Sequence, residues 1–487
     1  MKRTKLTLAA ALALNLLQAA AFAAGDAAPA RPNILMIVID TLRADHVSAY
    51  GYKRPTTPNI DKLSRSGVLF RSACSQSNWT LLSFASFLTG KYPRALGMLG
   101  PGKGVSGFDY PDLPLGRNEI TLPEALKKAG YRTAGFFTGR FNGPDYGFDH
   151  GFDLYRNYRN RSSDRGSPVK SFPAFLPEAY KWMAADRTKP FFLLLHSSEL
   201  HRPYRAPESF VKKYAGDYKG ALASTWLSRD VLSTIRKDGG GWSFSPEGSA
   251  EHGGPGGAQP ASNKPPMRLG PADMEYIAAR YDASLDYADK FVGEIIERAR
   301  KSAPEDTVIV VMADHGEGLG DHGGVLHCTN PPRLYQELVH VPLIISIPGK
   351  WLKAAAPVID QPVELVDLMP TLLDLAKAPR TPGISGKSLV GLISGAQSSE
   401  GFSGGVRPVF SETQGYGLTL RSVREKDWKL IFTEKSKDAP AKTELYDLGT
   451  DPSEQNDLTS RKPEMVEALR PLLEAWTVEN DKEKKLP

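Results

Sequence analysis

The stretch Pro32-Asn-Ile-Leu-Met-Ile-Val-Ile-Asp40 decides the fold of this chain. Six apolar residues follow Asn33 without interruption, and the run ends in a carboxylate. A continuous apolar run of this length is typical of a strand that is buried on both faces of a parallel sheet. Asp40 would then stand at the carboxyl end of a central strand.

Four other segments repeat this pattern, and helical patterns separate them. The further apolar runs cover residues 131–137, 191–195, 307–313 and 341–347. Capped or amphipathic helical patterns cover residues 57–66, 121–128, 271–300 and 367–376. This alternation predicts an α/β fold in which helices sandwich a mixed, largely parallel sheet.

The second half of the chain contains two changes of pattern. Residues 235–270 are rich in Gly, Pro and Ser and are expected to form a surface insertion. From about Pro379, short strand-like runs alternate with turns, and a helical pattern covers residues 463–478. We therefore expect a main domain over 32–378, followed over 379–487 by a C-terminal subdomain with a small antiparallel sheet and a terminal helix.

The N-terminus has the pattern of a secretory signal peptide. Residues 1–23 combine a cationic start, an apolar stretch and a small-residue cleavage site ending at Ala23. Residues 24–31 would be a flexible lead-in, and the mature protein would be periplasmic or secreted. No later segment is long enough to span a bilayer, so we expect no stable membrane insertion.

The net charge bears on possible partners, and the cysteine content bears on a possible disulfide. Removal of the cations of the signal segment lowers the formal net charge from +6 to +3, and no Lys/Arg cluster carries interleaved aromatic residues. A nucleic-acid partner is therefore not expected. Cys74 and Cys328 are the two cysteines. Export permits a disulfide between them, but two buried thiols are an equal alternative.

Polar side chains follow the predicted strands. Asp40, Arg140, His196 and the pair Asp314-His315 all stand at strand ends. Ligands of open α/β sheets bind beyond the carboxyl ends of the strands, and mixed carboxylate and imidazole groups suit divalent metals. The sequence thus predicts a metal or anion site at this edge of the sheet.

The stretch Asn78 to Gly90 (NWTLLSFASFLTG) predicts a short buried helix with Gly90 as its C-terminal cap. Thr80 stands near the start of this helix. Its hydroxyl is either an ordinary N-terminal cap or a nucleophile placed where a helix terminus stabilises negative charge.

Longer motifs resemble the sulfatase family of the alkaline-phosphatase superfamily. The opening Asp40-Thr-Leu-Arg-Ala-Asp45 and the segment Thr57-Pro-Asn-Ile-Asp-Lys-Leu63 look like the start of that family. His201-Arg-Pro-Tyr204, Glu364-Leu-Val-Asp-Leu-Met-Pro-Thr371 and Glu444-Leu-Tyr-Asp-Leu448 resemble its later signatures. The resemblance implies an alkaline-phosphatase-like fold, with residues 32–378 as the catalytic domain.

The resemblance also implies site roles, residue by residue. Asp40, Asp314 and His315 match metal-ligand positions for one divalent ion, which is Ca²⁺ by family habit, while Zn²⁺ or Mn²⁺ also suits these residues. Three matches concern catalysis: His201 at a leaving-group histidine, His327 at a lysine near the leaving group, and Arg140 at an anion-binding lysine. Thr80 falls at the nucleophile position.

The departures from the family pattern keep three functions open. Thr80 replaces the Cys or Ser that sulfatases convert to formylglycine, Leu82 replaces a Pro and Phe84 an Arg. Thr41 replaces a second carboxylate and Asn142 a histidine. Because threonine cannot give formylglycine by the same oxidation, the hydrated-aldehyde mechanism is not expected here.

The first hypothesis is a metal-dependent hydrolase of sulfate or phosphate esters, acting on a small-molecule or glycan ester through Thr80. The second is a phosphoglycerol- or phosphoethanolamine-type transferase or a phosphodiesterase. The third is a non-catalytic protein that binds sulfated ligands.

Overall fold

The computed structural model describes ten segments of the chain, together with residues 225 and 227. The segments are 31–99, 114–158, 172–223, 229–238, 241–244, 266–303, 306–327, 331–396, 406–437 and 440–483. The predicted signal peptide, residues 24–30 of the predicted lead-in, residues 245–265 of the predicted insertion, and Cys328 lie outside these segments.

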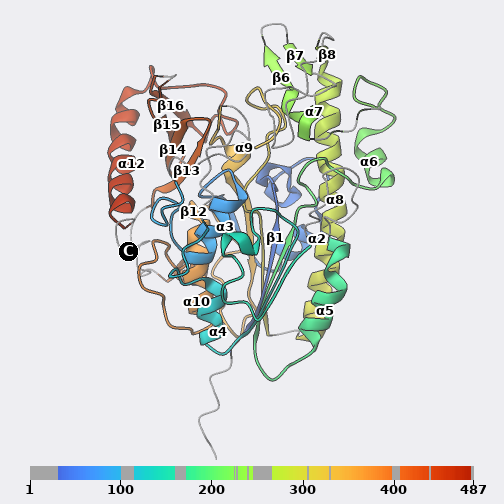
Figure 1. The fold of residues 1–487 in the computed structure, drawn as a ribbon, viewed down its shortest axis with the longest axis vertical. Coiled ribbons are helices and arrows are strands. Elements are labelled where there is room, and N and C mark those ends of the chain that lie inside the picture. The colour runs from blue at the N-terminus through green and yellow to red at the C-terminus, as the bar shows by residue number, and fades with distance from the viewer. Residues whose placement is uncertain are drawn as a thin grey trace, which may run out of the picture.

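A mixed, mostly parallel sheet forms the centre of the described chain (Figure 1). Its strand order is β11-β2-β10-β9-β1-β5-β3-β4, and β12 pairs with β2. Strand β10 runs antiparallel to both of its neighbours, while the other pairs are parallel. The strands are β1 Asn33–Ile39, β2 Val68–Cys74, β3 Arg132–Phe137, β4 Leu154–Asn157, β5 Phe191–Ser197, β9 Thr307–Met312, β10 His340–Ser346, β11 Val358–Ile359 and β12 Val363–Glu364. The five predicted strands and the fold class are confirmed.

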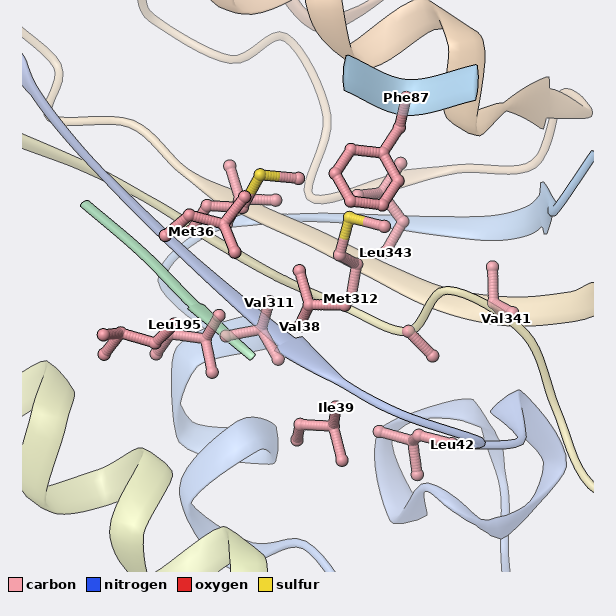
Figure 2. Close-up of a cluster of buried hydrophobic side chains, with 14 of the residues drawn as sticks. Met36, Val38, Ile39, Leu42, Phe87, Leu195, Val311, Met312, Val341 and Leu343 are labelled. Atoms are coloured by element: carbon pink, nitrogen blue, oxygen red, sulfur yellow. The ribbon is translucent and has the colours of Figure 1, made fainter. Parts of the chain in front are cut away.

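Strand β1 is central because every residue from Ile34 to Ile39 is fully buried. It pairs with β5 on one side and β9 on the other, so neither edge is exposed to water. In Figure 2, Phe87 points from a covering helix toward Met312 and Leu343 of the sheet. This double-sided burial explains why an uninterrupted apolar run marks the strand in the sequence.

Helices cover the sheet in two groups (Figure 1). On one side α8 packs with α2 and α5, and on the other α3 packs with α4 and α10. The helices are α2 Pro58–Ser64, α3 Thr80–Thr89, α4 Leu122–Lys128, α5 Leu176–Ala184, α6 Glu208–Ala215, α7 Arg229–Thr234, α8 Pro271–Ser302, α9 Gln336–Val339, α10 Leu368–Leu375, α11 Val390–Ser394 and α12 Pro463–Glu483. None of the helices in the described segments has both the length and the apolar character that a membrane span requires.

The C-terminal region has the predicted antiparallel sheet and terminal helix. Strands β13 to β16 form a four-stranded meander, and α12 packs against it. The strands are β13 Val409–Gly415, β14 Leu418–Glu425, β15 Trp428–Thr433 and β16 Lys442–Asp447.

The structure contains strands that the sequence analysis did not predict, among them β4, β11 and β12 at the edges of the main sheet. The sequence analysis did not predict β2, whose apolar pattern is interrupted by the exposed Arg71. The edges of the Gly/Pro-rich insertion are not only loop, because they form a three-stranded sheet of β6 Arg236–Asp238, β7 Gly241–Phe244 and β8 Met267–Leu269. Strand β2 is stabilised by pairing with β10, β11 and β12, which lie far along the chain, and a local pattern does not record such pairing.

Candidate active site

The carboxyl ends of β1, β5 and β9 bring together side chains from three distant parts of the sequence. Val38 of β1 is level with His196 of β5 and Met312 of β9, so Asp40 and Asp314 both lie just beyond the sheet. The carboxylate of Asp40 lies 3.9 Å from Nε2 of His196 and 3.6 Å from Nε2 of His315. Oδ2 of Asp314 lies 3.7 Å from the same His315 nitrogen.

This cluster has the properties of a cation site. Within the described chain, Oδ1 of Asp40, Oδ2 of Asp314 and Nε2 of His196 are buried without a hydrogen-bond partner. Asp40, His196 and Asp314 each offer a ligand atom within 4.8 Å of the others. Buried polar atoms are normally paired, and ligands about 2.0–2.2 Å from one ion lie roughly 3–4 Å apart. The residues therefore fit a divalent metal.

The electrostatics of the cluster lead to the same conclusion. Burial, with the neighbouring Asp314 carboxylate, raises the pKa of Asp40 well above its ordinary value. Burial lowers the pKa of His196 to about 4, so its imidazole is neutral at physiological pH and offers a lone pair. A cation would stabilise the two crowded carboxylates and use that lone pair.

Sequence reasoning left His196 out of the ligands of the first ion. Its place at a strand end was noticed, but its weak correspondence to the family suggested only a group that supports the ligands or a ligand of a second metal. The side-chain amide of Asn142 lies 2.9 Å from Nδ1 of His196. For Nε2 to offer its lone pair, Nδ1 must carry the proton, so Asn142 must accept it through its amide oxygen. The ring of Phe84 packs against the imidazole with centroids 5.0 Å apart. Two of the departures from the family pattern thus surround this histidine and hold its ring.

Thr41, which replaces the family's second carboxylate, contributes its backbone. Its φ of 62° is unusual for a β-branched residue. This conformation directs the Thr41 amide toward Oδ1 of Asp314 at 3.4 Å, and the hydroxyl of Tyr281 donates to the Thr41 carbonyl at 2.7 Å. The amide of His315 also donates to Oδ1 of Asp314, at 3.0 Å. Oδ1 of Asp314 is therefore held by backbone groups, which leaves Oδ2 directed into the cluster.

Thr80 lies beside this cluster and does not cap its helix. Helix α3 begins at Thr80 with Trp79 at the cap position, and no side chain caps it, so the capping alternative was wrong. Oγ1 of Thr80 instead lies 3.2 Å from Nε2 of His315. Nδ1 of His315 donates to the Gly316 carbonyl at 2.8 Å, which leaves Nε2 as the acceptor for the threonine hydroxyl. The predicted C-terminal cap is confirmed, because Gly90 adopts a φ of 68°.

Of the two predicted leaving-group histidines, His327 lies beside His315, and His201 lies beside His327. The ring of His327 lies 4.5 Å from that of His315 and 5.3 Å from that of His201. Nδ1 of His327 contacts Oε1 of Glu317 at 2.9 Å. Burial raises the pKa of Glu317 to about 7, so the Glu317–His327 pair can exchange a proton near neutral pH.

Arg202 and Arg140 are placed differently from each other. A guanidinium nitrogen of Arg202 lies 3.1 Å from Nε2 of His201, and the charge of Arg202 lowers the pKa of Asp40 against the larger effect of burial. The sequence analysis had not singled out this cation. Arg140 is exposed and stacks over Phe141, whose ring contacts Trp79 with centroids 4.7 Å apart. The exposed Arg140 is therefore linked through Phe141 to Trp79, the residue that precedes Thr80.

His322 and Cys74 make structural contacts and lie outside this cluster. His322 lies between Oε1 of Glu337, at 2.8 Å, and the backbone carbonyl of Glu454, at 3.0 Å. Cys74 is a buried free thiol 3.2 Å from Oγ of Ser411.

Comparison with known proteins yields one family. The family model described as Sulfatase matches residues 32–378, and the model described as N-sulphoglucosamine sulphohydrolase, C-terminal, matches residues 331–479. An arylsulfatase of Clostridium perfringens is 24% identical over 91% of this chain and 94% of its own length.

Two solved structures illustrate the likeness of the fold. One, determined in complex with its substrate D-glucosamine-2-N,6-O-disulfate, has a TM-score of 0.70 at 20% identity and covers 94% of this chain and 100% of its own. The phosphonate monoester hydrolase of Agrobacterium radiobacter has a TM-score of 0.66 at 20% identity, covering 92% of this chain and 96% of its own.

Proposed function

The chain belongs to the sulfatase family, and from that premise we propose that it is an exported, metal-dependent sulfuric ester hydrolase with Thr80 as its nucleophile. The observation that carries the proposal is the 3.2 Å contact between Oγ1 of Thr80 and Nε2 of His315. Beside it, one oxygen of Asp40 and one oxygen of Asp314 are buried without a hydrogen-bond partner among the described residues. The substrates are small-molecule or glycan sulfate esters, the class bound by the disulfated glucosamine complex. Export rests on the signal pattern of residues 1–23.

Two carboxylates and two imidazoles would hold the ion. Nε2 of His315 would then give its lone pair to the ion, and the Thr80 hydroxyl would face the ion instead of donating to that nitrogen. Asp40, Asp314 and His315 were predicted from the sequence, and His196 adds a second nitrogen. A set of two oxygens and two nitrogens suits Zn²⁺ or Mn²⁺ better than Ca²⁺, which prefers six to eight oxygen ligands. A bound ion would lower the pKa of the adjacent Thr80 hydroxyl and offset the charge of the ester oxygens.

The side chains of this site divide the remaining work. The hydroxyl proton of Thr80 passes to solvent before the ester binds. Oγ1 then attacks the sulfur, the bond from sulfur to the alcohol oxygen breaks, and the alcohol leaves with a proton from His327, whose imidazolium Glu317 stabilises. Arg202 and His201 bind the anionic oxygens of the ester. Water then attacks the sulfated threonine, with His327 taking its proton, and sulfate leaves as the Thr80 oxygen regains a proton.

Phosphate monoesters are the second candidate substrate class. Thr80 departs from the formylglycine precursor, and a threonine ester with phosphate is resolved by water in the same way as one with sulfate. The phosphonate monoester hydrolase resembles the fold of this chain nearly as closely as the structure with bound D-glucosamine-2-N,6-O-disulfate does, with TM-scores of 0.66 and 0.70.

The test is turnover of aryl sulfate, phosphate monoester and phosphodiester panels by metal-loaded wild type, Thr80→Ser and Thr80→Ala. We expect sulfate ester cleavage that Thr80→Ser retains in part and Thr80→Ala loses by 100-fold or more, on the order of a lost nucleophile. Mass spectrometry of rapidly quenched enzyme should find the added sulfo group on the peptide that carries Thr80.

Three outcomes would contradict the proposal in different ways. Turnover that Thr80→Ala leaves intact would exclude this nucleophile. Transfer of the group to an added alcohol in preference to water would favour a transferase. Tight binding of sulfated sugars without turnover would favour a binding protein.

A further inference from the structure

The segment that leads into the nucleophile helix is held by the C-terminal sheet. Strand β13 lies along residues 74–78 and bonds to them at three successive positions. Oγ of Ser411 donates to the Ser75 carbonyl at 2.6 Å, the amide of Glu412 donates to the Gln76 carbonyl at 2.8 Å, and Oγ1 of Thr413 contacts Oδ1 of Asn78 at 2.7 Å. The start of α3 is thus tied to a strand that follows it by more than 300 residues in the chain.

Asn78 also reaches the loop of the leaving-group histidine. Its Nδ2 lies 3.2 Å from the backbone carbonyl of His327. A carbonyl oxygen only accepts hydrogen bonds, so the amide nitrogen of Asn78 must face it. Oδ1 therefore faces Thr413, and the Thr413 hydroxyl must be the donor. Thr413 thus donates to Asn78, and Asn78 donates to the His327 carbonyl. We call these two consecutive hydrogen bonds the relay.

The relay is sealed from water. Thr413 is fully buried, while Asn78 and His327 are each 2% exposed. Solvent cannot replace a lost bond at this depth, and a buried acceptor without its donor is costly. Asn78 stands two residues before Thr80, so its position helps to set the start of α3 and the location of the Thr80 hydroxyl.

We propose that Thr413 and Asn78 are positioning residues that hold the His327 loop in register with Thr80. The C-terminal sheet is then part of the catalytic apparatus, although neither residue touches the reacting atoms. The inference rests on the proposed function, in which Thr80 attacks and His327 protonates the leaving oxygen. Loss of the relay should therefore impair proton donation more than substrate binding.

The chain offers matched variants for the test. Thr413→Val keeps the shape of the side chain and removes the donor, whereas Thr413→Ser keeps the donor. Ser411→Ala is the control for loosening of the same strand, because Ser411 bonds to the neighbouring Ser75 carbonyl and makes no contact in the relay.

Kinetics should separate positioning from general destabilisation. We expect Thr413→Val to lower kcat on the order of 10-fold with KM little changed, since small misplacements of catalytic groups have effects of this size or larger. The loss should be greater for alkyl sulfates than for nitrophenyl sulfate, whose leaving group needs no proton. Thr413→Ser should restore kcat, and Ser411→Ala should lower the melting temperature without the dependence on leaving group.

Amide hydrogen exchange gives a readout that does not require turnover. Thr413→Val should raise exchange in residues 78–82 and in residues 320–327, although Thr413 touches only the first of these segments. If wild type shows no turnover, the proposed function fails while the exchange result still decides the relay. Wild-type kcat in Thr413→Val, an equal leaving-group dependence in Ser411→Ala, or exchange that rises only within β13 would each overturn the proposal.

Discussion

Replacement of His196 by alanine should weaken binding of a divalent cation while leaving the fold intact. The imidazole is fully buried, its Nε2 lies 3.9 Å from the Asp40 carboxylate, and that nitrogen has no hydrogen-bond partner among the described residues. In the absence of a cation, the carboxylates of Asp40 and Asp314 repel each other inside the protein. A ligand role for His196 therefore predicts that added metal stabilises wild type more than the variant.

The expected size follows from linkage between binding and folding. An ion at 100 times its Kd stabilises the native state by about 2.7 kcal/mol. Removal of a direct ligand should weaken binding by roughly 100-fold or more, given that losses of about 10–100-fold follow removal of supporting residues alone. At the same ion concentration the variant would then gain only about 0.4 kcal/mol. For a chain of this size the difference corresponds to a shift in Tm of about 2–3 °C.

The assay compares chelator-stripped protein with and without Zn²⁺ or Mn²⁺, by calorimetry and by elemental analysis after dialysis. His340→Ala is the matched control, because Nε2 of His340 lies 2.8 Å from the Arg71 carbonyl, away from the cluster. It should keep the full metal-dependent increment. A wild-type Kd and wild-type metal content in His196→Ala would refute the assignment of His196 as a ligand.

Three further substitutions test the electrostatics and packing around the site. Phe84→Arg, which restores the family's residue, should destabilise the protein by about 3–5 kcal/mol, because Phe84 is fully buried against His196 and Phe87; a denaturation midpoint equal to that of wild type would contradict this. Burial by itself lowers the pKa of His322, but its hydrogen bond to Glu337 and the charge of that residue outweigh burial, and the pKa is raised. The stability lost in His322→Gln should thus be largest below pH 6.5, the ordinary value, and should shrink as the pH rises through the raised pKa; a loss that does not vary with pH would count against it. Burial raises the pKa of Glu199 to about 8, so wild type loses stability as the pH rises toward that value. Glu199→Gln should exceed wild type by on the order of 2 kcal/mol at pH 9 and by little at pH 5, and superimposable unfolding curves at pH 9 would refute the argument.

Helix α4 is an element that the sequence of its own residues predicts. The sequence Thr121 to Gly130 predicts a helix with a threonine cap at its start and a glycine at its end. The hydroxyl of Thr121 accepts a hydrogen bond from the amide of Glu124 at 3.3 Å. The cap, the helix and the closing glycine lie within ten residues, so neighbouring positions alone encode the outcome. The same holds for β1, where burial on both faces requires an apolar residue at every position.

At Thr80, in contrast, the local sequence did not predict the contact that the side chain makes. Its place at a helix start favoured a cap, whereas the hydroxyl contacts His315, which follows it by 235 residues. The family resemblance identified Thr80 as the nucleophile candidate, yet only the folded chain brings its oxygen to an imidazole.

The sequence alone therefore determined the class of fold, the family, and the strand ends on which Asp40, Asp314 and His315 stand. Apolar periodicity and motif spacing are properties of neighbouring residues, so they can be read directly from the sequence. The tertiary structure decided that His196 joins the carboxylates and that Thr413 reaches Asn78. These contacts depend on the register between strands far apart in the chain, which is set by packing of the whole core and leaves no local pattern.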